Sequence, residues 1–132
     1  MKHNYKEIIK QLKKGYDVWQ ENEGDSFVYF MSDNINDGQL LLEERDEGII
    51  IWNNDIKHKS FFEMYDLLLG NIKQDFYFPC VETKEEVGAI LSLGGVEIDI
   101  EKELVGIELA NDYSREYGSF VVREKAYGRK NI

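Results

Sequence analysis

The sequence predicts a single α+β domain, with a mainly antiparallel sheet and about three helices packed on it. Two observations lead to this prediction. Short runs of β-branched and aromatic residues are separated by turn residues, which is typical of antiparallel strands. Segments with apolar residues at helical spacing interrupt these runs without strict alternation, which disfavours a doubly wound parallel sheet. The 132 residues fit one domain, 1–132, and a frayed tail is expected over residues 126–132.

The first half of the chain predicts one helix followed by four strands. Asn4 and Glu7 form a variant of the capping box, and apolar residues then recur at helical spacing as far as Gly15. Turn residues at 36–38 and 46–48 separate apolar runs, as tight antiparallel connections require. The four strands are expected over Tyr16–Gln20, Phe27–Met31, Gln39–Glu44 and Ile49–Trp52.

The second half predicts two helices and four more strands. Ser60 with Glu63, and Thr83 with Glu86, form capping boxes that begin the two helices. The strands are expected over Phe76–Val81, Val96–Ile100, Leu104–Ala110 and Tyr117–Arg123. The second and third of these strands are expected to form a hairpin through residues 101–103. The expected element order is therefore α-β-β-β-β-α-β-α-β-β-β.

The sequence indicates a cytoplasmic protein. Cys80 is the only cysteine, which excludes an intramolecular disulfide and a cysteine-rich zinc site and suits a reducing compartment. No apolar run follows the N-terminal lysines, as it would in a signal peptide. No segment approaches the roughly 20 apolar residues that cross a bilayer. We therefore expect a cytoplasmic location and no membrane partner.

No motif in the sequence identifies an enzyme or a cofactor. The glycine patterns of dinucleotide and phosphate sites and the GxSxG nucleophile motif do not occur. Cys80 would need a base such as His58 and a third group that the sequence does not supply, so a buried inert thiol is favoured. His3 and His58 lack the spacing of a zinc motif, and residues 33–37 lack the register of a calcium loop. We expect no cofactor, no metal and no enzymatic activity.

Net charge is the strongest global signal. The chain carries a formal charge of -10, from 26 acidic and 16 basic residues. Residues 1–14 carry +4 and residues 123–132 carry +3, so residues 15–122 carry −17. Such a body repels nucleic-acid phosphate and attracts basic proteins. Its acids are clustered at turns, and clustering raises the local field in which a basic partner associates.

Two acidic clusters and one aromatic loop supply the candidate partner-binding residues. Glu97, Asp99 and Glu101 alternate along an expected strand, so their side chains should leave the same face. They fit either an acidic stripe that faces a basic ligand or the solvated side of an antiparallel strand. Tyrosine and arginine are typical interface anchors. The full set is Glu43, Glu44, Asp46, Glu47, Glu97, Asp99, Glu101, Glu103, Tyr113, Arg115 and Tyr117.

The charge pattern favours a non-enzymatic, acidic protein-binding module. In composition the chain resembles bacterial immunity proteins, which block nuclease or other toxins. That resemblance implies a basic, toxin-like protein partner, brought in by electrostatic steering and then covered at its active site. No nucleic-acid partner is expected.

Two alternatives remain open. One is a small ligand-binding domain or enzyme whose pocket is lined by carboxylates and aromatic side chains. The other is a self-assembling accessory protein. In that case the basic N-terminal helix and the acidic body would support a homo-oligomer through head-to-tail contacts.

Overall fold

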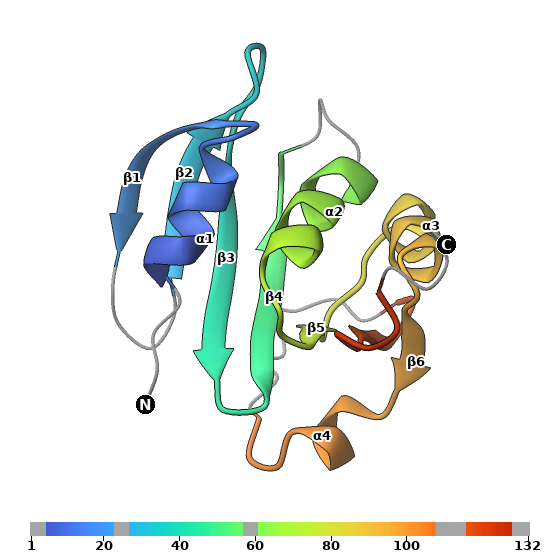
Figure 1. Ribbon diagram of the computed structural model, residues 1–132. Coiled ribbons are helices and arrows are strands. Elements are labelled where there is room, and N and C mark those ends of the chain that lie inside the picture. Colours follow the sequence, from blue (N-terminus) through green and yellow to red (C-terminus); the bar gives the residue numbers. More distant parts are fainter. Residues whose placement is uncertain (1–4, 23–26, 57–60, 108–115, 128–132) are drawn as a thin grey trace.

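The computed structural model describes residues 5–22, 27–56, 61–107 and 116–127 (Figure 1). These residues form a seven-stranded sheet and four helices, which confirms the expected α+β class. The strand order is β1-β2-β3-β4-β5-β7-β6. Every neighbouring pair is antiparallel except β4 and β5, which run parallel.

The first four strands form the expected antiparallel meander. Alternation along β2 places Phe27, Tyr29 and Met31 in the core and leaves the intervening residues half-buried. One irregularity in register occurs between β1 and β2, and another between β3 and β4. The strands are β1 (Asp17–Asn22), β2 (Phe27–Ser32), β3 (Asp37–Arg45) and β4 (Gly48–Asn54).

A crossover through helix α2 (Phe61–Asn71) makes the next pairing parallel. The chain leaves β4, passes along α2 and returns as β5 (Phe76–Phe78), with Ile49 opposite Phe76. Because the chain returns through α2 and residues 72–75 before it pairs again, β5 re-enters in the same direction as β4. Beyond β5 lie β7 (Ser119–Val122) and, at the sheet edge, β6 (Val96–Ile98).

Three helices cover one face of the sheet. Figure 1 shows α1 (Tyr5–Leu12), α2 and α3 (Lys84–Ser92) side by side over the strands. The main core lies between these helices and the sheet, and its largest fully buried side chains include Tyr29, Tyr65, Phe76 and Phe78. The expected cap of α3 is present, because the Thr83 side chain accepts a hydrogen bond from the Glu86 N–H at 3.2 Å.

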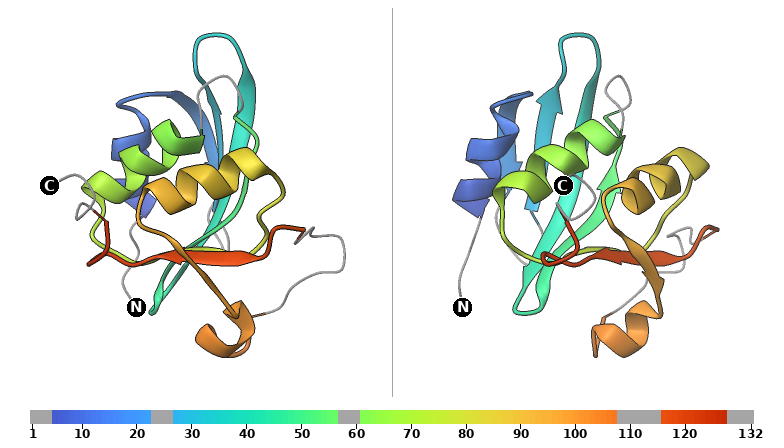
Figure 2. Two further views of the ribbon diagram at one scale, coloured as in Figure 1. Left: turned by 90° about the vertical axis from the view of Figure 1, so that its right-hand side faces the viewer. Right: turned by 45° about the vertical axis from the view of Figure 1, so that its right-hand side comes forward.

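A second, smaller core lies on the opposite face. It is covered by the short helix α4 (Ile100–Glu103), which Figure 2 shows apart from the other three helices. The buried residues of this second core are Ile50, Trp52, Tyr77, Cys80, Ile100, Leu104, Ile107 and Val121.

The predicted hairpin between Val96–Ile100 and Leu104–Ala110 is wrong. Among the described residues, β6 pairs with β7 alone, and the chain turns into α4 at Ile100. Ile100, Leu104 and Ile107 follow one another at helix-like spacing, and burying all three on the second core outweighs continued alternation. Residues 108–110 lie outside the described residues. As a consequence, Glu97, Asp99 and Glu101 do not share the face of one strand.

The tail expected from residue 126 is ordered at its beginning. Tyr127 packs against the main core, and its hydroxyl donates a hydrogen bond to Asp66 of α2 at 2.5 Å. Burial, followed by the neighbouring Asp66 carboxylate, raises the pKa of Tyr127 to about 12. Residues 128–132 lie outside the described part of the chain.

A substitution at Gly48 tests how closely β4 approaches the segment before β5. Its φ is +155°, and a Cβ there would collide with the carbonyl oxygen of Asp75. We expect Gly48→Ala to lower the free energy of unfolding by about 2 kcal/mol. Gly88, in α3, is a matched control because a Cβ there meets nothing within 4 Å. Gly88→Ala should raise the free energy of unfolding by about 0.5–1 kcal/mol. Equal urea midpoints for the two variants would contradict this account.

Candidate functional site

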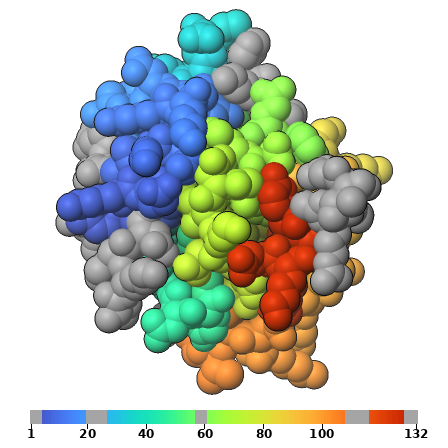
Figure 3. Space-filling model, viewed as in Figure 1, coloured from blue at the N-terminus to red at the C-terminus, as the bar shows by residue number. Residues whose placement is uncertain are grey.

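The two acidic clusters of the sequence meet at one end of the molecule. Figures 1 and 3 show the turn between β3 and β4 next to α4. The Ile49 N–H donates to the Asp75 carbonyl oxygen at 2.9 Å, and Arg123 pairs with both Asp75 and Glu103. These contacts join the turn to α4, and Asp99, the N-cap of α4, continues the surface to β6. We call this surface the acidic end. It comprises Asp46, Glu47, Glu97, Asp99, Glu101 and Glu103, all of them exposed.

Arg123 holds the acidic end together. Its guanidinium donates to Glu103 and to the Tyr77 hydroxyl, the latter at 3.2 Å, and lies 3.6 Å from the Asp75 carboxylate. It also lies 5.9 Å from the centre of the Tyr77 ring, within cation–π range. The hydrogen bond to Glu103 raises the pKa of Arg123. The arginine therefore ties α4 to β5 and β7.

Glu43 and Glu44 are less exposed to a binding partner than the sequence suggested. Both are half-buried. The Glu43 carboxylate accepts hydrogen bonds from Arg45 at 3.0 Å and from the Trp52 indole at 3.1 Å. One Glu44 carboxylate oxygen is buried as well. The exposed charge of this hairpin is therefore carried by Asp46 and Glu47.

An open hollow of about 660 Å³ adjoins the acidic end beside β6. β6 is the last strand of the sheet, and no strand pairs with its outer edge within the described residues. Exposed carboxylates at Glu97 and Asp99 flank the less exposed Ile98. This arrangement suits a lysine or arginine side chain, whose aliphatic stem prefers an apolar surface and whose head prefers a carboxylate. The hollow is lined by Glu97, Ile98, Asp99, Ile100, Gly118 and Ser119.

Of the three aromatic-loop candidates, Tyr117 is described, and it is not among the residues that line this hollow. Tyr117 is half-buried against the main core, and its backbone N–H donates to the Val81 carbonyl oxygen at 3.3 Å. Tyr113 and Arg115 lie outside the described residues.

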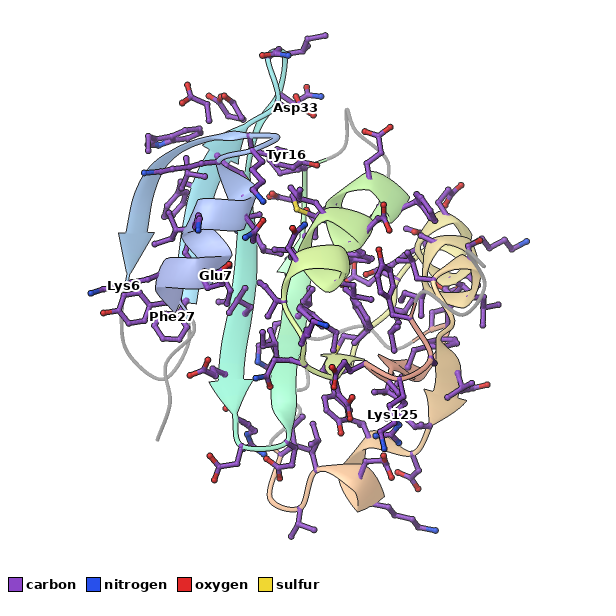
Figure 4. All side chains as sticks on the ribbon, in the orientation of Figure 1. Lys6, Glu7, Tyr16, Phe27, Asp33 and Lys125 are labelled. Atoms are coloured by element: carbon purple, nitrogen blue, oxygen red, sulfur yellow. The ribbon has the colours of Figure 1, made fainter. Side chains whose placement is uncertain are left out.

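Within the described part of the chain, one group of exposed lysines lies on and just after α1, and others lie near the acidic end. Lys6 and Lys10 are exposed on α1, Lys13 is exposed directly after it, and Figure 4 shows Lys6 on the side of the molecule away from α4. Lys102 is exposed within α4, 4.0 Å from Asp99. A further exposed lysine, Lys125, follows β7. The acidic end is thus a mixed surface with an acidic excess.

A second pocket, of about 210 Å³, lies where β4 and β5 end. The carboxylate of Glu86, a lining residue, accepts a hydrogen bond from the hydroxyl of the buried Tyr65 at 2.5 Å. Burial raises the pKa of Glu86, and it also raises the pKa of Tyr65. The pocket is lined by Trp52, Asn53, Asn54, Asp55, Phe61, Cys80, Glu82, Thr83 and Glu86.

The sequence does not predict this pocket. Its patterns give Glu86 only a capping role and Cys80 only a place in a strand. The one available signal is the Thr83–Glu86 capping box, which places the start of a helix just after a strand. The parallel pairing that brings the end of β4 beside it leaves no local signal in the sequence.

The described residues show neither a membrane span nor a metal centre. None of their helices has the length and apolarity that a bilayer crossing requires. Among the same residues, no three His, Cys, Asp or Glu side chains are grouped closely enough to hold a metal ion.

Comparison with known proteins gives no assignment. No protein-family model, no curated protein and no solved structure matches this chain. Function must therefore be argued from the two sites.

Arg123→Gln tests the link between α4 and the sheet. The change removes the ion pairs to Asp75 and Glu103, which are partly exposed and therefore screened by solvent. We expect the free energy of unfolding to fall by about 1 kcal/mol. Amides of α4 should also exchange hydrogen faster. Lys125→Gln makes the same change of charge at an exposed neighbour and should alter neither quantity. Equal effects of the two substitutions would show that Arg123 does not hold α4.

Glu86→Gln tests the electrostatics of the pocket through pH. Because the pKa of Glu86 is raised above its ordinary value of 4.5, folding favours the protonated carboxyl. That stabilisation is fully present below pH 4.5 and is lost as the pH rises through the folded-state pKa. The glutamine still accepts the Tyr65 hydrogen bond but does not titrate. We therefore expect the variant to gain stability relative to the parent protein between pH 4.5 and neutrality.

Urea unfolding of both proteins at a series of pH values measures this difference. Among the described residues, Tyr65 and Glu82 act on Glu86, and Asp55 and Cys80 share the pocket lining with it; all four are present in both proteins. The pKa of Tyr65 is raised, so its hydroxyl stays neutral throughout this range. A stability difference that does not change with pH would refute the assignment.

Proposed function

We propose that this chain is a non-enzymatic module that binds and neutralises a basic, toxin-like protein, in the manner of bacterial immunity proteins. The observation that supports this proposal is the meeting of the two acidic clusters at one end, beside an open hollow at the sheet edge. The mechanism needs no catalytic group. The lone buried thiol of Cys80 is compatible with the reducing cytoplasm, where we place the encounter.

Binding would proceed in two steps. The acidic excess first draws in a basic surface and raises the association rate. A lysine or arginine of the partner then enters the hollow, with its stem on Ile98 and its head between Glu97 and Asp99. Val96, which is 52% exposed, adds apolar contact area on the same strand. The bulk of the chain covers the partner's active surface.

A small-ligand-binding role is the second candidate. It is favoured by the pocket at the ends of β4 and β5, whose lining combines carboxylate and aromatic side chains as that alternative requires. The two roles use different residues and can coexist.

Affinity capture from the native cell tests the neutralisation proposal. The bait is the full chain, at low and at high salt. A double variant, Glu97→Gln with Asp99→Asn, removes two charges at the hollow. We expect a basic protein to be recovered stoichiometrically by the parent chain at low salt and lost at high salt. The double variant should recover about tenfold less.

The control variant is Asp17→Asn with Asp37→Asn. It removes the same charge at two exposed positions, one in β1 and one in β3, away from the hollow. It should retain the partner. If both double variants lost the partner equally, net charge alone would explain the loss. If the Glu97→Gln with Asp99→Asn variant captured the partner as well as the parent chain does, the hollow would be excluded as the interface.

A further inference from the structure

The central strands of the sheet bury their two faces against different parts of the chain. Along β5, Phe76 and Phe78 lie in the main core, whereas Tyr77 between them lies in the second core. Buried residues of β4 and β7 alternate between the two cores in the same way. Because the main core holds alternate side chains of each strand, these strands stay packed under α1 to α3 when the second core is opened.

Helix α4 is attached to the second core by apolar side chains. Ile100 and Leu104 are 2% and 0% exposed, and they belong to the same buried cluster as Ile50, Tyr77 and Val121 of the strands. The backbone hydrogen bonds described for this segment are internal to it, so they are kept when the segment moves as a unit. Lys102 and Glu103 donate to Asp99, Leu104 donates to Ile100, and Ile107 donates to Leu104.

The ion pair between α4 and the sheet is partly exposed to solvent. Arg123, directly after β7, donates to Glu103 of α4, and the two side chains are 39% and 36% exposed. Ion pairs of this exposure contribute little and are screened by salt. The pair therefore adjusts the position of α4 by a modest factor, which depends on salt.

Asp99 connects β6 to α4 and has the features of a hinge. Its backbone is extended, with φ at −89° and ψ at 97°, and its side chain makes no capping hydrogen bond with α4. Hinges are residues at the ends of elements that absorb a change in backbone angles. A rotation at Asp99 leaves the hydrogen bonds between β6 and β7 in place.

We propose that α4 is a hinged cover, which opens from the second core about Asp99 while the sheet and the main core stay folded. Arg123 raises the fraction of molecules in which the cover is closed. Opening exposes apolar side chains of the central strands and moves Glu101 and Glu103 away from Asp46 and Glu47. The closed form therefore presents the complete acidic end.

The cover also couples to the partner surface. A basic protein that contacts both acidic clusters binds the closed form better than the open form, so its binding lowers the open fraction. This consequence rests on the proposed function, whereas the opening itself does not.

Methyl relaxation-dispersion NMR of the full chain, with labelled isoleucine, leucine and valine, tests the opening. We expect exchange on the microsecond-to-millisecond timescale at Ile50, Ile100 and Leu104 of the second core. Ile8 and Leu68 of the main core should give flat profiles. Equal exchange in both cores would show that the whole protein unfolds, and would overturn the proposal.

Substitution of Arg123 tests its role in closure. Arg123→Gln should raise the open fraction about fivefold, whereas Lys125→Gln, the same change of charge at an exposed neighbour, should leave it unchanged. Added salt should raise the open fraction of the parent protein but not that of the Arg123→Gln variant. The salt series on the parent protein keeps the test valid if a variant does not fold.

A pair of cavity variants makes a flat result decisive. Leu104→Ala weakens the packing of the cover and should raise the open fraction by more than tenfold. Leu68→Ala makes the same truncation in the main core and should leave exchange at Ile50 and Ile100 unchanged. Flat profiles at Ile50 and Ile100 in the parent protein and in the Leu104→Ala variant would overturn the proposal.

The two proposals fail separately. Exchange confined to the second core, without any captured partner, would support the cover and remove the neutralisation role. Partner capture with flat methyl profiles would do the reverse. When both hold, a bound partner should suppress the exchange at Ile100 and Leu104.

Discussion

The parallel pairing of β4 with β5 is the constraint on which the rest of the structure depends. Ile49 and Phe76 pair on the side of the main core, and Ile50 and Tyr77 pair on the side of the second core. Because both faces of this pair are buried, helices α1 to α3 must cover one side and α4 the other. Antiparallel strands then extend the sheet on each flank, with the meander on one side and β7 and β6 on the other.

The same pair separates the two sites. At the amino ends of the two strands, Gly48 lies against the backbone of Asp75, the residue that precedes Phe76. The acidic end begins there. Its carboxyl ends open into the pocket that contains Glu86. In a parallel pair, the amino ends of the two strands lie together and so do their carboxyl ends. Side chains of the turn and of α4 therefore lie near the amino ends, and the starts of two helices lie near the carboxyl ends. A hairpin at this place would have closed one of these ends with a tight turn.

Local signals account for the part of the fold that the sequence predicted. Turns and alternation define the meander, and the side chain of Thr83 defines the start of α3. Helix α4 was not predicted because Val96–Ile100 alternates as a strand does. The four-residue spacing from Ile100 to Leu104 indicates a helix only once it is known that a second core buries both side chains. For the site, composition identified the two acidic clusters but did not predict that they lie side by side. Their proximity involves the contact of Arg123 with Glu103, and that contact depends on the order of the strands. The pocket depends on the same non-local pairing.

The distribution of charge also bears on self-association. The basic face of α1 and the acidic end lie on different sides of the molecule, so two copies would meet head to tail, and such contacts form either a closed ring or an open chain. The field for that encounter is weakened by Lys102 and Lys125, which lie among the acids, and exposed ion pairs contribute little in physiological salt. A partner with a larger positive surface and a side chain that fits the hollow gains both steering and burial. This difference is the reason for proposing a different protein, and not a second copy, as the partner of the acidic end.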